Sequence, residues 1–142
     1  MPDADLKTPL HEAACYGHIE VVKYLMKKVQ DPNIQSNNGV TPIFAAAEQG
    51  YTEVVKYLAS VVKNPNVADQ DGDTPMHLAA RLGSIEIVKC LAEKVKDPNP
   101  PNTDGETPID IATEEGHTEI VKILESKLEV SNVQKAKRQR RA

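Results

Sequence analysis

A block of ten residues occurs four times in this chain, and its copies are spaced by 33 residues. Each copy begins with threonine and proline and ends with glycine: TPLHEAACYG, TPIFAAAEQG, TPMHLAARLG and TPIDIATEEG. Lysine and leucine recur beyond the block at the same step, as Lys23, Lys56, Lys89, Lys122, Leu25, Leu58, Leu91 and Leu124. A period of this length is typical of a solenoid, in which each unit buries its apolar face against its neighbours.

Each unit predicts two helices that are separated by a turn. In the first unit, Thr8 and Pro9 form an N-cap and a proline at the first helical position, and Gly17 supplies a left-handed stop. The segment that follows, IEVVKYLMKKV, has apolar residues at three- and four-residue steps, which predicts an amphipathic second helix. We expect the second helices to end at a proline, because the residue before proline avoids the α region. These prolines are Pro32, Pro65 and Pro98.

Four such units in phase resemble the ankyrin repeat. The stretch DGDTPMHLAARLGSIEIVKCL is similar to the ankyrin signature D-x-x-G-x-T-P-L-H-x-A-A-x-x-G-x-x-x-[IV]-V-x-x-L, and an Asn-Gly or Asp-Gly pair marks a tight turn before each later unit. The resemblance covers residues 3–128 and implies an all-α fold: an ankyrin-repeat solenoid of four helix-turn-helix plus hairpin-loop units. We expect a single domain at residues 1–130, with repeats at about 3–35, 36–68, 69–101 and 102–130, followed by a basic C-terminal tail at 131–142.

Some positions at the two ends depart from the ankyrin pattern. Leu6 stands where the later hairpins have glycine, and Glu12 stands where the later units have alanine, leucine and isoleucine. The last unit carries Thr113 in its first helix. Polar substitutions of this kind are typical of terminal repeats, which face water on one side.

The histidine of the signature is expected, from the resemblance, to brace neighbouring loops by hydrogen bonds. His11 and His77 keep this residue, whereas Phe44 and Asp110 replace it in the other two units. Asp110 can still face the helix N-terminus favourably. Phe44 cannot accept a hydrogen bond, so we expect the adjoining loop to be held less firmly.

No catalytic or metal-binding pattern is recognisable in the sequence. The other two histidines, His18 and His117, begin the second helix of their units, and no HExxH, GxSxG or GxxxxGK[ST] motif occurs. Cys15 and Cys90 have no zinc-type spacing, and we expect both to be reduced thiols. The sequence therefore predicts a protein that is not an enzyme and has no cofactor and no metal site.

The candidate binding residues are those that vary between units while the frame stays constant. In ankyrin repeats these positions lie at the hairpin tips and on the exposed side of the first helix, and together they line a concave groove. A constant frame with a variable surface is typical of a binding scaffold. Carried over position by position, the predicted partner-binding residues are Lys7, Tyr16, Asn37, Asn38, Val40, Glu48, Gln49, Gln70, Asp71, Asp73, Arg81, Leu82, Thr103, Asp104, Glu106, Glu114 and Glu115.

Charge is distributed unevenly along the chain. Residues 1–133 contain 21 acidic and 12 basic residues, a formal charge of −9, and the acidic side chains are concentrated in the groove positions of the last two units. Such a surface should attract a protein partner with a basic segment. In the alternative interpretation, the carboxylates merely keep the protein soluble. The negative charge and the scarcity of aromatic residues disfavour nucleic acid as a partner.

The last nine residues, QKAKRQRRA, contain five basic residues and no acidic one. Lys137, Arg138, Arg140 and Arg141 resemble a short nuclear-import signal. A basic arm for nucleic acid or acidic partners and a solvated end without a role are the alternatives. The N-terminus has no apolar signal-peptide segment, and no stretch is long and apolar enough for a transmembrane helix. We therefore expect a monomer inside the cell, cytoplasmic or nuclear or both, without membrane contact.

The leading hypothesis for function is a non-catalytic protein–protein interaction module. It would act as an adaptor, inhibitor or regulator that binds its partner through the concave face of hairpins and inner helices. The alternative is a structural or engineered ankyrin scaffold, or a fragment of a longer cytoskeletal-type array, without one dedicated partner. Regular spacing and near-identical second helices favour the alternative, whereas the irregular first unit and the basic tail speak against a pure consensus design.

Overall fold

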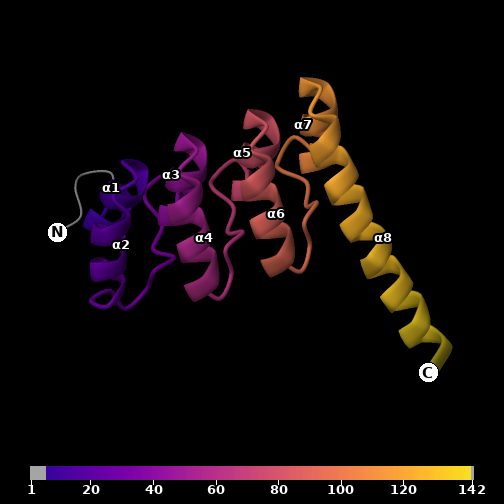
Figure 1. The fold of residues 1–142 in the computed structure, drawn as a ribbon, viewed down its shortest axis with the longest axis horizontal. Helices are drawn as coiled ribbons and strands as arrows, with labels where there is room; N and C mark the ends of the chain where they lie inside the picture. The colour runs from indigo at the N-terminus through magenta and orange to yellow at the C-terminus, as the bar shows by residue number, and fades with distance from the viewer. Residues whose placement is uncertain (1–5, 142) are drawn as a thin grey trace.

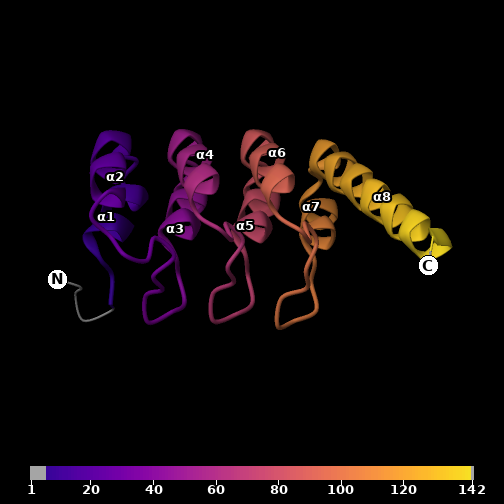
Figure 2. The same ribbon diagram turned by 90° about the horizontal axis from the view of Figure 1, so that it is seen from below.

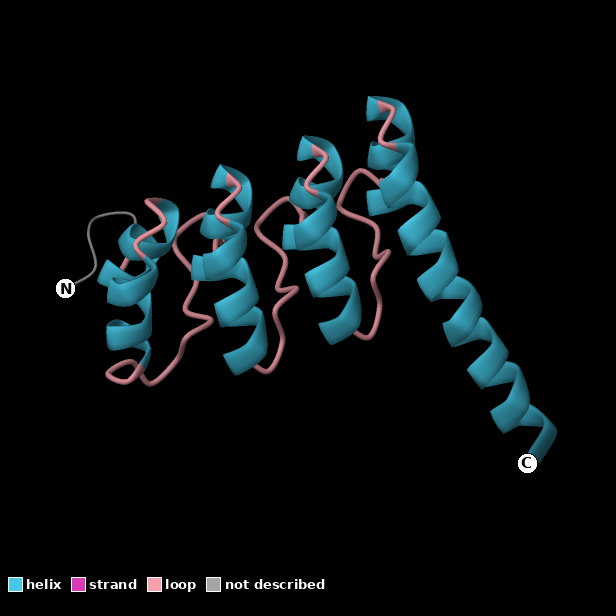
Figure 3. Ribbon diagram, viewed as in Figure 1, coloured by secondary structure: helices cyan, strands magenta, loops and turns pink. Residues whose placement is uncertain are grey.

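The computed structural model describes residues 6–141, with side chains described up to residue 129. Within that range the chain forms eight α-helices and no strand (Figure 3). In chain order they are α1 (Pro9–Cys15), α2 (Ile19–Met26), α3 (Pro42–Gln49), α4 (Thr52–Val61), α5 (Pro75–Leu82), α6 (Ile85–Lys94), α7 (Pro108–Glu115) and α8 (Thr118–Arg141). Two helices fall in each 33-residue unit, as the sequence predicts.

The helix pairs stand side by side in a single row that runs from the N-terminus to the C-terminus (Figure 1). Seen at right angles, the first helices α1, α3, α5 and α7 lie between the second helices on one side and the hairpin loops on the other (Figure 2). Each first helix contacts the next first helix, and each second helix contacts the next second helix. The predicted all-α solenoid is confirmed. We call the surface formed by the hairpin loops and the exposed residues of the first helices the inner face.

Threonine and proline begin all four first helices, as predicted. Each threonine hydroxyl accepts a hydrogen bond from the backbone N–H three residues further on. In the third unit the cap is reciprocal, because the Thr74 N–H donates to Nδ1 of His77 at 3.0 Å. In the fourth unit, Oδ2 of Asp110 accepts from the Thr107 N–H at 3.0 Å, and this hydrogen bond lowers the pKa of the Asp110 carboxyl. The favourable position expected for Asp110 at the helix N-terminus is thus confirmed.

The second helices end earlier than expected. The expected end at the proline is wrong: α4 ends at Val61 and α6 at Lys94, and the next residues, Val62 and Val95, are extended with ψ angles of 148°. The extended backbone directs Val62 into the core, where 8% of its surface remains exposed. Burial of this valine therefore ends the helix before the restriction imposed by proline applies.

The Asp/Asn-Pro-Asn segment that follows α4 and α6 is a turn that supports the next unit. The Asp97 carboxylate accepts from the Asn99 N–H at 3.0 Å, and the Asn99 side chain accepts from the Ile109 N–H at 2.9 Å. Asn66 accepts from the Met76 N–H in the same way, at 3.3 Å. These bonds satisfy amides at the start of a first helix that have no partner within the helix, which explains the asparagine in the second and third units. Asn33 differs: its amide nitrogen donates to the Asn64 carbonyl at 2.9 Å, and its buried side-chain oxygen has no hydrogen-bond partner among the described residues.

Helix α8 differs from the other second helices because it continues to Arg141, past the end of the row (Figure 1). No glycine follows Gly116 and no proline follows Pro108 in the sequence. The two residue types that most readily end a helix are therefore missing from this segment. The domain boundary expected near residue 130 falls inside α8, and it stays a prediction.

Alanine, valine, leucine and isoleucine build one continuous core along the row. Small alanines let neighbouring first helices approach closely. The fully buried members include Ala46, Ala79, Ala112, Val55, Val88, Leu58, Leu91 and Leu124. Cys15 and Cys90 are partly buried free thiols. Burial raises the pKa of the Cys90 thiol, which lowers its thiolate content and its reactivity.

Leu6 is the one non-glycine residue with a positive φ between residues 6 and 141, at 61°. It occupies the position of Gly39, Gly72 and Gly105, whose φ angles are 79°, 76° and 79°. A side chain in the left-handed region costs about 1–2 kcal/mol, partly offset because glycine has more freedom in the unfolded chain. We therefore expect Leu6→Gly to raise the free energy of unfolding by up to about 1 kcal/mol in denaturant titrations.

Gly39→Ala is the matched control for this prediction. A Cβ at residue 39 would meet the backbone nitrogen of Gln70 at 2.9 Å, and the residue has a φ of 79°, so this substitution should lower the free energy of unfolding. Equal stability of the native chain and the Leu6→Gly variant would show that the first hairpin carries no strain.

Candidate functional site

The hairpin loops of the inner face are joined to one another by hydrogen bonds. The Gln70 N–H donates to the Asn38 carbonyl at 2.9 Å, and the Thr103 N–H donates to the Asp71 carbonyl at 3.0 Å. The Thr103 hydroxyl donates to the same Asp71 carbonyl at 2.9 Å. The predicted hairpin residues of three units are therefore held in a constant register along the row.

His11 and His77 brace the hairpin of the following unit, as expected. Nδ1 of His77 accepts from the Thr74 N–H, so the ring proton is on Nε2, which donates to the Glu106 carbonyl at 3.0 Å. Nε2 of His11 lies 2.7 Å from the Val40 carbonyl. Both imidazoles therefore serve as structural braces. Whether the loop beside Phe44 is held less firmly stays a prediction.

A hollow of about 270 Å³ lies on the inner face between the first and second units. From the predicted set it brings together Lys7, Asn38, Val40, Glu48 and Gln49. Glu12 lines the hollow as well, and the prediction missed it. We call the residues that occupy the same position in the four units a column. Glu12 could have been recognised in the sequence because it is a carboxylate in a column that is otherwise apolar. This end of the inner face thus combines one basic residue with two acidic residues and amides.

In the third and fourth units, predicted residues interact with each other. A guanidinium nitrogen of Arg81 lies 3.9 Å from the Asp73 carboxylate, and the Asn102 amide donates to the same carboxylate at 2.9 Å. The acidic side chains of Asp71, Asp104, Glu114 and Glu115 around this pair are exposed. Arg81 is therefore held in place among carboxylates and does not neutralise them.

The residue at the base of the second, third and fourth hairpins holds the turn, and it was not among the predicted binding residues. Oδ1 of Asp69 accepts from the N–H groups of Asp71 and Asp73 at 2.9 and 3.0 Å. Asn102 makes the same two bonds in the fourth hairpin, and the Ser36 hydroxyl accepts one in the second. The missed signal is a column in which every residue carries a side-chain oxygen.

Asp69 is less easily ionised than an ordinary aspartate. Burial raises the pKa of its carboxyl, the two accepted hydrogen bonds oppose this, and repulsion by Asp73 and Asp71 adds to the rise. Because the folded pKa lies above the unfolded value, the folded state binds more protons than the unfolded state at pH values near and between these two pKa values. The stability that this proton contributes is present below the unfolded pKa and is lost as pH rises through the folded pKa.

Asp69→Asn should therefore stabilise the protein at neutral pH. Asparagine keeps an acceptor oxygen, as Asn102 shows, and removes the charge. We expect a gain of less than about 1 kcal/mol at pH 7, because the site is partly solvated, and a smaller gain near pH 3. Denaturant titrations at the two pH values measure the difference. A gain that is larger at pH 3 than at pH 7 would contradict the expected sign.

The inner face carries the excess negative charge of the row. Residues 6–18, 35–51, 68–84 and 101–117 form the hairpins, the first helices and the turns that follow them, and they contain ten acidic and two basic residues. Residues 19–34, 52–67, 85–100 and 118–129 form the second helices and the loops after them, and they contain nine acidic and ten basic residues. The basic residues of the first set are Lys7 and Arg81. The two sides of the molecule therefore differ in charge.

Two predicted residues lie at the margin of the inner face. Tyr16 is 62% exposed and lines a depression at the N-terminal end of the row, not the hollow between the first two units. Leu82 is 52% exposed at the end of α5. The import-signal candidates Lys137, Arg138, Arg140 and Arg141 lie beyond the residues whose side chains the structure describes.

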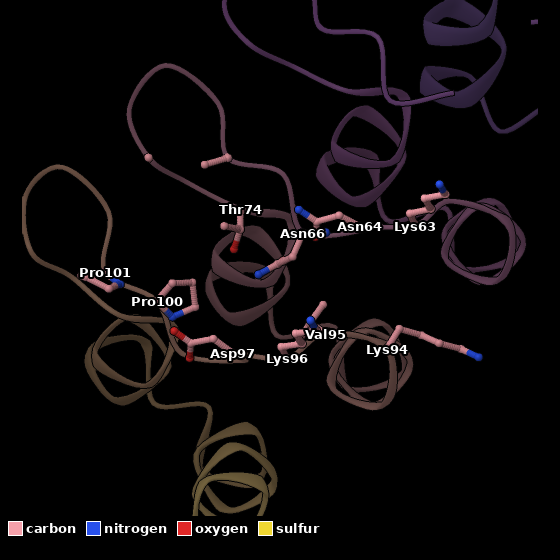
Figure 4. Close-up of a pocket in the computed structure, with 12 residues that line it drawn as sticks. Lys63, Asn64, Asn66, Thr74, Lys94, Val95, Lys96, Asp97, Pro100 and Pro101 are labelled. Carbon is pink, nitrogen blue, oxygen red and sulfur yellow. Dashed lines mark hydrogen bonds between the residues drawn. The ribbon is translucent and has the colours of Figure 1, made fainter. Parts of the chain in front are cut away.

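A larger hollow of about 620 Å³ lies beneath the third unit, between the turns that follow α4 and α6 (Figure 4). Asn64, Asn66 and Asp97 line it, and the side chains of Asn66 and Asp97 are already engaged in the turns described above. Lys94 points away from the other side chains that line it (Figure 4). The hollow is therefore part of the framework, and its polar groups do not converge on one point.

Comparison with protein families identifies the framework. The family model described as ankyrin repeats (3 copies) matches residues 1–67 and, a second time, residues 61–135. The chain belongs to the ankyrin-repeat family. Ankyrin repeats are generally protein–protein interaction modules and not enzymes. In the part of this ankyrin protein that the structure describes, no group of three or more His, Cys, Asp or Glu side chains could hold a metal ion. In that same part of the chain, no helix is long and apolar enough to cross a membrane.

Proposed function

We propose that this ankyrin protein binds a protein partner non-catalytically through its inner face, and that the bound segment is basic. The observation that carries the proposal is the charge of the segments that form the inner face. They contain ten acidic residues and two basic ones, on the first helices and on hairpins that hydrogen bonds hold in register. A rigid acidic surface attracts a basic segment and needs little ordering when it binds.

The acidic end of the inner face supports a specific docking geometry. The exposed Asp71 and Asp104 lie on adjacent hairpins that are joined by the bond from Thr103, and Glu114 and Glu115 lie at the end of the neighbouring α7. A basic side chain placed between the two hairpins would meet carboxylates from both. The alternative, a scaffold without a dedicated partner, requires no such concentration of charge on one side.

The test compares two variants that change net charge equally on different sides. The inner-face variant is Asp71→Lys, Asp104→Lys and Glu115→Lys, and the control is Glu53→Lys, Glu119→Lys and Glu125→Lys on the second helices. Proteins captured from lysate by the native chain are identified, and their affinities for all three chains are measured by calorimetry at two salt concentrations. Circular dichroism verifies that both variants fold.

We expect the inner-face variant to lose at least about tenfold in affinity and the control to lose less than about threefold. The affinity of the native chain should also fall as salt rises. If both variants lose affinity equally, charge on the inner face does not direct binding and the proposal is wrong. If the native chain captures no protein above background, the scaffold alternative replaces it.

A further inference from the structure

We propose that the N-terminal end of the row is a second docking surface, which accepts one further ankyrin-type helix pair. This N-terminal face consists of Pro9, His18, Val21, Tyr24 and Leu25. Four of these residues line a shallow depression of about 540 Å³, and Tyr24 lies beside them on α2. The depression adjoins the hollow of the inner face at Lys7 and Glu12, but none of the five residues of the N-terminal face lines that hollow, so the inference does not depend on the proposed function.

Burial along the row is the first observation. Val21 is 48% exposed, whereas its equivalents Val54, Ile87 and Ile120 are 1%, 0% and 0% exposed. Each equivalent lies in a second helix that contacts the second helix of the preceding unit. Proline shows the same change, because Pro9 is exposed and the prolines that begin α3, α5 and α7 are buried. The first unit thus has apolar residues at the same positions as the later units, but they are exposed, whereas in the later units the preceding unit covers them.

The tyrosine column is the second observation. Nζ of Lys23 lies 5.8 Å from the ring centroid of Tyr57, so a lysine of the first unit covers a tyrosine of the second. Tyr24 is the equivalent of Tyr57, and it is 61% exposed. The ring of Tyr24 is approached by Lys28 of its own unit at 5.5 Å. A preceding helix pair with a lysine in the Lys23 column would cover Tyr24 as Lys23 covers Tyr57.

The residue that precedes each second helix is the third observation. Nε2 of His117 lies 3.2 Å from the Arg81 carbonyl, and its ring lies against Gly83, where a Cβ would meet it at 2.7 Å. Tyr51 lies against Gly17 in the same way. His18 has the position of His117 and Tyr51, and its ring lies beside Tyr16, with centroids 6.3 Å apart. It is positioned to cover the final glycine of a preceding first helix.

The C-terminal end of the row excludes a second copy of this chain, stacked head to tail, as the occupant. Asp110, Thr113 and Glu125 are exposed there. The preceding units have buried aromatic rings at the first of these positions, buried alanines at the second, and Met26 and two buried alanines at the third. Stacking would bury two carboxylates, and α8 extends past this end (Figure 1). The occupant we infer therefore presents a surface like those that the first three units present to their successors. Among the described residues at the N-terminal end, Glu12 is the one carboxylate in a column that is buried in the later units, and it lines both the depression and the hollow of the inner face. Its carboxylate can therefore stay on the inner-face side of a helix pair that packs on α2.

The test adds one unit to the full chain and measures whether the added unit packs on this face and unfolds together with the rest of the protein. A copy of residues 36–68 is fused ahead of Asp3, which preserves the 33-residue register. Unfolding in guanidinium chloride is followed by circular dichroism for the native and fused chains. We expect one transition for the fused chain and an equilibrium constant of unfolding lower by at least about tenfold.

Val21→Glu tests whether the added unit is stabilised by packing on the N-terminal face. In the native chain the side chain is exposed, so the substitution should change the unfolding constant by less than about threefold. In the fused chain it should raise the constant by about tenfold or more, because the carboxylate would be buried. Val61→Glu is the control: Val61 is 46% exposed on α4, and its effect should be equally small in both chains.

Two results would overturn the inference. One is a fused unit that unfolds in a separate transition, with Val21→Glu equally mild in both chains. The other is a native chain that sediments as a dimer and becomes a monomer on Val21→Glu, because a second copy would then be the occupant of the N-terminal face.

Discussion

Leu91→Ala is expected to lower the free energy of unfolding by about 3–5 kcal/mol. Leu91 is fully buried on α6, a helix that contacts the second helices of the units on both sides. Removing it takes away the transfer free energy of three carbons and leaves a cavity between units that pack against one another. The measurement is a denaturant titration followed by circular dichroism at 222 nm, with the slope of the transition used to check that unfolding stays cooperative.

Leu25→Ala is the matched control for this prediction. Leu25 occupies the same column in the first unit, where it is partly exposed because no described unit covers it. We expect a cost of about 1–2 kcal/mol. Equal costs for the two leucines would show that burial by the preceding unit contributes little to stability, contrary to a core that is shared between units.

His77→Phe is expected to cost about 2–4 kcal/mol although it preserves the size of a buried ring. His77 has no exposed surface, accepts from the Thr74 N–H and donates to the Glu106 carbonyl. Phenylalanine fills the site, as Phe44 does in the second unit, but it leaves both backbone groups without this partner. An unpaired buried polar group costs about 1–3 kcal/mol. Denaturant titration measures the total, and hydrogen exchange at Thr74 locates it.

His11→Phe provides the comparison for His77→Phe. His11 makes equivalent bonds, but its partner Thr8 is partly exposed, so water can replace one of them. We expect a smaller cost, of about 1–2 kcal/mol. A His77→Phe chain within about 0.5 kcal/mol of the native protein would show that the ring acts through its volume alone.

The chemistry of the sequence accounts for most of the local structure. Threonine followed by proline specifies each helix start, and a glycine such as Gly50, with a φ of 78°, specifies the end of a first helix, because these preferences act within a few residues. The ends of the second helices were predicted wrongly for the complementary reason. Val62 and Val95 leave the helical conformation, and their side chains pack against a core that other units help to form. The preference of the residue before proline depends only on its neighbours in the chain and does not include the free energy of this burial.

The binding surface was predictable as a set of positions but not as an arrangement of side chains. Variation between units selected the hairpins and the exposed sides of the first helices. It did not predict that Asp73 would hold Arg81, nor that Asp69 and Asn102 would support their turns through their own backbone amides. Those contacts depend on distances between hairpins and within turns, which a comparison of columns does not contain.

The sequence by itself determined the period, the helix pairs, the solenoid and the family, because a repeat that packs on its own copy needs the same residue types in every copy. The tertiary structure alone decided which copies of a column are covered. Val21 and Ile87 are equivalent in sequence, yet one is 48% exposed and the other is fully buried. The physical reason is that burial belongs to the interface between units, and the N-terminal face of the first unit has no described unit in front of it.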